Sequence, residues 1–218
     1  LILPIFEKAF EIAKTGRPGP VLVDIPKDVT AATCKFTSKP VEFPARVSHT
    51  IKDEDIDTAL YRISKAKKPF IFVGGGAVTA GADVELKEFV KKVNAPVTDS
   101  LMGKGAFDGT DPLYTGMLGM HGTKTSNFGI MECDLLIVVG ARFSGRVTGD
   151  TKRFAPNARI IQFDIDPAEI NKNIRVDASI IGDVKAILKA VNTNLSQLNH
   201  EDWVNKIMDM KEQVYFIL

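Results

Sequence analysis

Cysteine is scarce in this sequence of 218 residues: there are two, Cys34 and Cys133, and they lie far apart in the chain. They form no C-x-x-C pair, which excludes a disulfide framework and a zinc site of the usual spacing. Long apolar runs are also missing, since none approaches the roughly 18 to 20 residues that span a bilayer. We therefore expect reduced thiols, no membrane partner and a cytoplasmic location.

An excess of charge of either sign is absent as well. The formal net charge is +1, and no block of Lys and Arg stands without acidic neighbours, so we expect no nucleic-acid partner. No cluster of His, Cys, Asp and Glu has metal-ligand spacing, and no Ser, Cys or Lys lies in a nucleophile motif. The sequence therefore offers no metal site and no catalytic residue of its own.

Short apolar runs bounded by glycine or proline alternate with segments of helical period through most of the chain. Strands are expected at 69–73, 96–99, 135–139, 159–163 and 179–181, and helices near 53–66, 81–93, 123–132, 184–191 and 201–213. Asp53 is expected to cap the first of these helices. Strands that alternate with helices predict an α/β fold with a doubly wound parallel sheet.

The first fifty residues follow a different pattern. A helix is expected over 4–15 and a buried strand over 20–26, which together are too little for a core. The segment 31–50 has no period and reads as a linker. The chain opens with Leu rather than Met and closes on apolar residues. We therefore expect a piece of a longer protein: the end of one domain in 1–30, a complete domain in 51–195, and a helix in 196–218 that leads onward.

Two loops that follow predicted strands have the composition of nucleotide-binding segments. Gly74–Gly81 is rich in glycine, which lets a backbone approach a ligand closely, although a turn needed for tight packing explains it equally well. Gly140–Gly149 holds Arg142 and Arg146 among glycines, and the guanidinium fork matches phosphate oxygens. The alternative for the two arginines is surface pairing with carboxylates.

Acidic residues and a histidine occupy the other loops. Asp166 follows a strand and could accept hydrogen bonds from ribose hydroxyls, or it could cap the turn that starts at Pro167. Asp183 raises the same choice, with capping favoured. His121 lies in a glycine-containing loop and could stack on a ring system, although a lone histidine is more often structural. These loops meet at one edge of a parallel sheet, so the sequence predicts a nucleotide-binding crevice.

Five stretches in the same order resemble the flavin-containing, biosynthetic acetolactate (acetohydroxyacid) synthases, which use thiamine diphosphate. They are Gly16–Val29, Leu101–Phe107, Gly116–Gly122, Gly140–Phe143 with Arg146–Gly149, and Asp164–Ile170. The resemblance covers essentially the whole chain. It implies a Rossmann-like central domain that binds FAD in 51–195, preceded by the tail of a pyrimidine-binding domain and followed by a diphosphate-binding domain.

For the full-length enzyme, the resemblance implies decarboxylating condensation of pyruvate with a second 2-keto acid in branched-chain amino-acid synthesis. It also implies thiamine diphosphate and Mg²⁺ held outside this chain, and a homodimer or homotetramer with or without a regulatory small subunit. The chain alone is then expected to be inactive, and a monomer or weak dimer.

The resemblance assigns FAD contacts to individual positions. The residues that match those lining the flavin site are Arg17, Gly74, Gly75, Gly76, Thr98, Leu101, Met102, Leu118, Gly119, Met120, His121, Gly140, Arg142, Arg146, Val147, Asp164, Asp166, Gly182 and Asp183. One departure is visible: the family usually has an acidic residue before the second arginine, where Ser144 and Gly145 stand here.

Two other interpretations stay open at this point. A stand-alone nucleotide-binding or regulatory module could use the same fold, since fold alone does not determine function. The helix and strand expected within 4–26 argue against such a module. Another thiamine-dependent enzyme, such as a pyruvate oxidase or a glyoxylate carboligase, is the third reading, and the stretches Met102–Phe107 and Gly119–Gly122 disfavour it.

Overall fold

The computed structural model describes residues 2–33, 35 and 50–215 of the chain. The chain divides into two compact units, residues 1–49 and 50–218. Most of the predicted linker over 31–50 lies outside the described residues. The domain boundaries within these units remain predictions.

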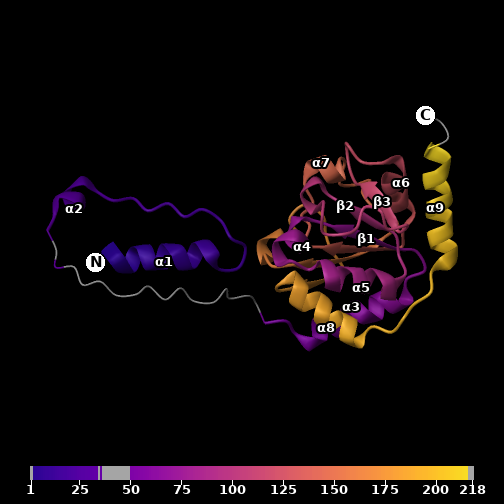
Figure 1. Ribbon diagram of the computed structural model, residues 1–218, viewed down its shortest axis with the longest axis horizontal. Helices are drawn as coiled ribbons and strands as arrows, with labels where there is room; N and C mark the ends of the chain where they lie inside the picture. The colour runs from indigo at the N-terminus through magenta and orange to yellow at the C-terminus, as the bar shows by residue number, and fades with distance from the viewer. Residues whose placement is uncertain (1, 34, 36–49, 216–218) are drawn as a thin grey trace. The chain divides into compact units, whose positions relative to one another are not determined.

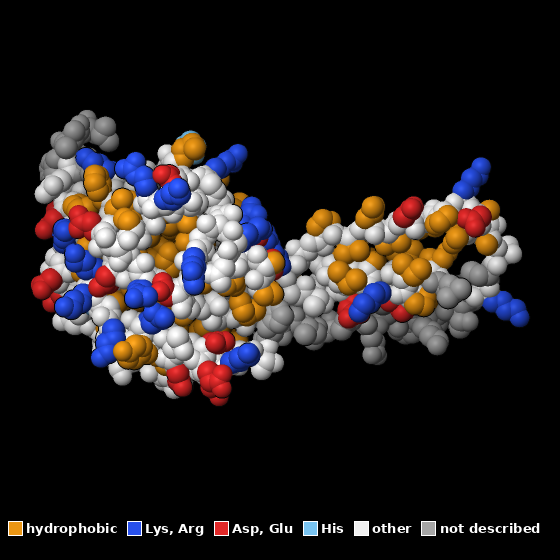
Figure 2. Space-filling view, turned by 180° about the vertical axis from the view of Figure 1, so that it is seen from behind, with side chains coloured by type: hydrophobic (Ala, Val, Ile, Leu, Met, Phe, Trp, Pro, Cys, Tyr) orange, Lys and Arg blue, Asp and Glu red, His pale blue; other side chains and the backbone are white. Residues whose placement is uncertain are grey.

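The described part of the first unit contains two helices, α1 (Ile2–Lys14) and α2 (Lys27–Ala31). The predicted first helix is confirmed. The strand expected over 20–26 is wrong: this segment forms no strand, and Leu22 is 94% exposed. A strand needs a neighbour to receive its backbone hydrogen bonds, and the described part of this unit supplies none. The side chains of Ile5 and Phe10 on α1 are likewise exposed, and hydrophobic side chains are visible on this unit in Figure 2.

The second unit is built on a six-stranded sheet in which all paired strands are parallel. The strands are β1 (Pro69–Val73), β2 (Val97–Asp99), β3 (Tyr114–Met117), β4 (Leu135–Val139), β5 (Arg159–Asp164) and β6 (Ala178–Ile181). Their spatial order is β3-β2-β1-β4-β5-β6. The chain therefore builds outward from β1 in one direction and then, starting with β4, in the other. The predicted doubly wound α/β fold is confirmed.

Both faces of the sheet are covered by helices, and the central strands are apolar along their whole length, as burial on both faces requires. Every residue of β1 and β4 is buried. Helices α3 (Asp53–Lys65), α5 (Asp83–Val93) and α8 (Val184–Asn194) pack on one face, and α6 (Lys124–Glu132) and α9 (Glu201–Tyr215) on the other (Figure 1). On the second face, Trp203 of α9 is buried and its Nε1 donates to the Pro69 carbonyl over 2.9 Å.

The loops contain short elements that the periodicity does not predict. They are the helices α4 (Gly75–Ala80) and α7 (Gly145–Thr148), the 3-10 turns η1 (Leu101–Gly103) and η2 (Pro167–Glu169), and the strand β3. Asp53 is the first residue of α3 rather than its cap, a position that Lys52 takes without a side-chain hydrogen bond. An acidic residue in the first turn still interacts favourably with the helix dipole.

Candidate functional site

The carboxyl ends of the six strands form one edge of the sheet, and the loops predicted to bind a nucleotide all follow these ends. In an open parallel sheet, ligands bind outside the carboxyl ends of the strands, at the point where the strand order reverses. In this sheet the reversal lies between β1 and β4. The site is therefore centred on the loops that begin at Gly74 and Gly140.

These two glycine loops lie directly against each other. The amide of Gly74 donates to the Val139 carbonyl and the amide of Gly76 to the Gly140 carbonyl, both over 2.9 Å. A Cβ on Gly76 would lie 2.8 Å from the Gly140 Cα, and Gly140 has a φ of +59°. Tight packing thus accounts for glycine at Gly74, Gly76 and Gly140, as one of the two readings of the sequence predicts. The same packing keeps backbone, rather than side chains, at the centre of the edge.

The turn after β2 forms the next part of the edge. Its residue Met102 lies beside the glycine loop, since a Cβ on Gly75 would be 3.1 Å from the Met102 Cβ. The side chains of Leu101 and Met102 nevertheless remain 69% and 74% exposed. Thr98 differs, because it is buried and its hydroxyl donates to the Gly116 carbonyl over 2.7 Å. This side-chain hydrogen bond connects β2 with β3.

The loop after β3 packs against α7, the short helix that follows β4. The amide of Met120 donates to the Arg146 carbonyl over 2.9 Å, and Gly119, with a φ of +98°, has no room for a Cβ beside that same carbonyl. Leu118 is buried, whereas Met120 is 73% exposed and His121 is exposed. The loop therefore presents an apolar side chain and an imidazole at the surface.

Both arginines of the loop after β4 are exposed, Arg142 just beyond the strand end and Arg146 within α7, where Val147 is half-buried. Ser144 is the residue that precedes α7, and it makes no side-chain cap. The departure from the family pattern at Ser144 and Gly145 thus falls at the first turn of this short helix. The two guanidinium groups therefore place positive charge at the solvent-exposed edge.

Carboxylates follow the last two strands. Asp164 is 8% exposed, and burial raises the pKa of its side chain above the usual value, even though its Oδ1 accepts from the Asp166 amide over 3.0 Å. The side chains of Asp166 and Asp183 cap the helical turns that follow, by accepting from the amides of Ala168 and Ala186. Gly182 donates its amide to the Asp164 carbonyl. The capping alternative for Asp166 and Asp183 is therefore confirmed, and a ligand contact stays a prediction.

Eighteen of the nineteen predicted positions thus lie along one edge of the second unit. They include the loops after β1, β2, β3 and β4 and the residues at the ends of β5 and β6. Arg17 is the exception, since it belongs to the first unit and is exposed there. A ligand contact for Arg17 stays a prediction.

Gln162 belongs to this edge but was not among the predicted positions. It is fully buried in β5, where its Nε2 donates to the Ala141 carbonyl over 3.3 Å and lies 3.4 Å from the Asp164 Oδ2. Its Oε1 is buried without a hydrogen-bond partner among the described residues. The signal in the sequence was a glutamine within the apolar run Arg159–Phe163. Gln162 therefore links the loop that carries Arg142 to the buried carboxylate of Asp164.

The groups along this edge are of kinds that bind nucleotides. Close-packed glycine backbone and exposed guanidinium groups suit phosphates, a buried carboxylate suits ribose hydroxyls, and exposed apolar side chains suit a flat ring. Among the described residues, no group of three or more His, Cys, Asp or Glu could hold a metal ion. In the same part of the chain, no helix is both long and apolar enough to cross a membrane.

Known proteins place this arrangement in a family. Residues 56–191 match the family described as "Thiamine pyrophosphate enzyme, central domain". The chain is 50% identical to the acetolactate synthase large subunit of Parasynechococcus marenigrum over 83% of its length, and 43% identical to the acetolactate synthase isozyme 2 large subunit of Escherichia coli over 96%. It covers 30% and 37% of those two proteins, so it spans about a third of their length.

A solved structure shows the same likeness in three dimensions. An X-ray structure from Mycobacterium smegmatis, assigned to the thiamin diphosphate-dependent enzymes, superposes with a TM-score of 0.73 at 26% identity. The match covers 90% of this chain and 37% of that one. From the sheet order, the match over 56–191 and this superposition, the chain belongs to the family of thiamine pyrophosphate enzyme central domains.

Proposed function

We propose that this chain is the central, FAD-binding part of an acetolactate synthase large subunit. The observation that carries the proposal is that eighteen predicted positions lie along the edge where the strand order reverses between β1 and β4. The large-subunit identity is supported by relatives of that name that are 43% and 50% identical to this chain.

The flavin would be held by several groups of this chain with separate tasks. The loops at Gly74 and Gly140 let the pyrophosphate approach backbone, while Arg142 and Arg146 neutralise its charge. Asp164 accepts hydrogen bonds from ribose hydroxyls, and Met102 packs against the ring system. When bound, the flavin would supply a redox-capable ring. The resemblance to the acetolactate synthases implies a largely structural flavin, with no net redox change in the main reaction.

The activity belongs to the longer protein in this proposal. It is the decarboxylating condensation of pyruvate with a second 2-keto acid, with thiamine diphosphate and Mg²⁺ bound by other parts. Its location is cytoplasmic, and its assembly is a homodimer or homotetramer, with or without a regulatory small subunit. The chain by itself contributes flavin binding and has no activity.

A chimera tests the activity directly. The matching segment of the Escherichia coli isozyme 2 large subunit is replaced by this chain, and the purified product is assayed for acetolactate formation from pyruvate and for retained FAD. We expect both, since 43% identity preserves the core of a domain. A folded chimera that retains thiamine diphosphate but neither binds FAD nor forms acetolactate would contradict the proposal.

A further inference from the structure

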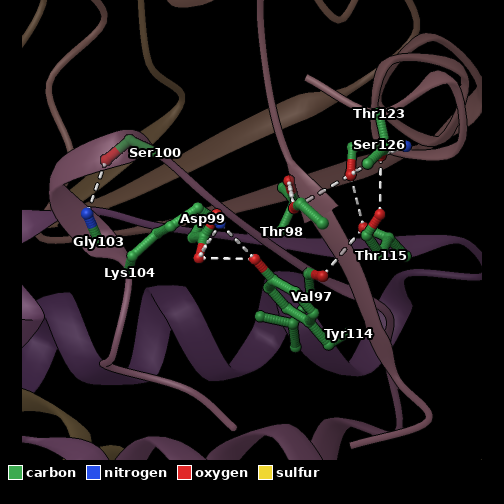
Figure 3. A network of polar contacts seen from close by, with 11 residues as sticks. Val97, Thr98, Asp99, Ser100, Gly103, Lys104, Tyr114, Thr115, Thr123 and Ser126 are labelled. Carbon is green, nitrogen blue, oxygen red and sulfur yellow. Dashed lines mark hydrogen bonds and ion pairs between the residues drawn. The ribbon is translucent and has the colours of Figure 1, made fainter. Parts of the chain in front are cut away.

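A cluster of three polar side chains lies next to the turn that carries Met102, and none of its members is among the predicted flavin contacts. The cluster consists of Asp99 at the end of β2, Lys104 after η1, and Tyr114 at the start of β3 (Figure 3). Lys104 Nζ lies 3.2 Å from Asp99 Oδ1 and 2.8 Å from the Tyr114 hydroxyl, which donates to Asp99 Oδ2 over 2.8 Å. Each member therefore contacts the other two.

The cluster is built around a buried charge. The side chain of Asp99 is only 6% exposed, whereas that of Lys104 is 49% exposed. The hydrogen bond to Tyr114 is the main cause that raises the pKa of Lys104, so this amine stays protonated at neutral pH. A buried carboxylate that loses its cation is strongly disfavoured, so the ion pair holds Lys104 in place.

The cluster closes the turn from both sides. Asp99 and Lys104 flank the residues Ser100–Gly103, and within the turn the Gly103 amide donates to the Ser100 carbonyl over 2.9 Å and to its hydroxyl over 3.1 Å. A salt bridge thus joins the residues that flank the turn, and within the turn the side chain of Ser100 caps the amide of Gly103. The turn cannot open without breaking one of them.

The closed turn packs against the end of β1 and the glycine loop that begins at Gly74. The Ser100 amide donates to the Val73 carbonyl over 2.9 Å, and Gly103 has no room for a Cβ beside that carbonyl. Since Met102 also lies beside Gly75, a shift of the turn would move an exposed apolar side chain relative to the centre of the edge. The position of that side chain is therefore coupled to the salt bridge.

We propose that Asp99, Lys104 and Tyr114 form a positioning cluster that sets the place of Leu101 and Met102 against the isoalloxazine ring of bound FAD. This inference rests on the proposed function, because it assigns residues that act through the flavin site. The three residues would act through the turn rather than by contact with the flavin, because they hold in place the turn that carries Leu101 and Met102.

The test compares Lys104→Met and Lys104→Arg with Lys206→Met in the full chain. Lys206 pairs with Glu132 on the surface and serves as the matched control. Amide hydrogen exchange is followed at Gly103, with Ile71 of β1 as the reference for global unfolding. FAD affinity and the visible spectrum of the bound flavin are then measured for each variant.

We expect Lys104→Met to accelerate exchange at Gly103 about tenfold more than at Ile71, to weaken FAD binding about tenfold, and to shift the flavin spectrum. Lys104→Arg should keep the wild-type exchange rate, FAD affinity and flavin spectrum because it keeps the positive charge. Lys206→Met should leave the same three quantities unchanged. Equal acceleration at Gly103 and Ile71, or unchanged FAD affinity in Lys104→Met, would overturn the positioning role.

The two proposals fail in different ways. A wild-type chain that binds no FAD would overturn the flavin site and the positioning role together. A wild-type chain that binds FAD, beside a Lys104→Met variant that binds it equally well and with the same spectrum, would overturn the positioning role alone.

Discussion

Gly74, just beyond the end of β1, lies so close to Ala141, just beyond the end of β4, that a Cβ on Gly74 would be 2.5 Å from the Cβ of Ala141. This contact joins the two loops at the point where the strand order reverses. The centre of the candidate site is therefore fixed by packing before any ligand binds.

Gly74→Ala should destabilise the protein because the new methyl group has no space between the two loops. The expected loss in the free energy of unfolding is about 1–3 kcal/mol, measured by urea denaturation. Gly145→Ala is the control, since a Cβ there meets nothing within 4 Å and the change should be under about 1 kcal/mol. Equal effects of the two substitutions would show that the loops are not packed as described.

Asp164→Asn should stabilise the free protein at neutral pH. Burial raises the pKa of Asp164 above the usual 3.8, so between these two values the folded state binds more proton than the unfolded state. Stability from this group then falls as pH rises from 3.8 through the folded-state pKa, and the ionised carboxylate opposes folding above it. The variant lacks that penalty.

Thermal unfolding of wild type and Asp164→Asn over a range of pH checks this sign. The advantage of the variant should be largest at pH values above the raised pKa and should shrink as the pH approaches 3.8. A wild type that is more stable than the variant at neutral pH would show that the carboxylate is favoured in the folded protein.

Cys133 should be inert to thiol reagents in the folded protein. It is fully buried, and burial raises the pKa of its thiol to about 12, so almost no thiolate exists at neutral pH. In a Cys34→Ser variant, labelling of the remaining thiol should follow the rate of unfolding and become fast only in denaturant. Rapid labelling under native conditions would contradict the burial of Cys133.

Trp203→Phe should test how firmly α9 is attached to the sheet. The substitution removes the hydrogen bond to the Pro69 carbonyl and is expected to cost about 1–2 kcal/mol of unfolding free energy. Tyr61→Phe on α3 is the control, because Tyr61 is 65% exposed and its loss should cost less than about 0.5 kcal/mol. Circular dichroism is the probe, since the chain has one tryptophan.

The sequence predicts the elements that depend on local pattern. The strands at Pro69–Val73 and Leu135–Val139 have the predicted bounds because a continuous apolar run between breakers is specific to a strand buried on both faces. It does not predict β3, since Tyr114–Met117 mixes polar residues with a glycine and becomes a strand by pairing with β2. It wrongly predicts a strand over 20–26, where the apolar run is typical of a strand but the described residues of the first unit include no partner strand.

The composition of the site was predictable and its internal contacts were not. Glycines and arginines after strands identify the edge. That Gly74 meets Ala141, that Gln162 supports the arginine loop, and that Asp99, Lys104 and Tyr114 join around one turn depend on which strands are neighbours. Residues 15 positions apart, such as Asp99 and Tyr114, are brought together by the parallel pairing of β2 and β3.

The most direct test of the proposed flavin site is a calorimetric titration of FAD into the wild-type chain and its Arg142→Ala variant, with Arg153→Ala as a control. Because Arg142 is exposed, its removal should leave the unfolding midpoint of the ligand-free protein unchanged. The account predicts saturable binding that raises the unfolding midpoint of the wild type, about ten- to a hundredfold weaker binding in Arg142→Ala, and wild-type affinity in Arg153→Ala. Binding of equal strength in all three proteins would contradict a flavin site at the edge between β1 and β4.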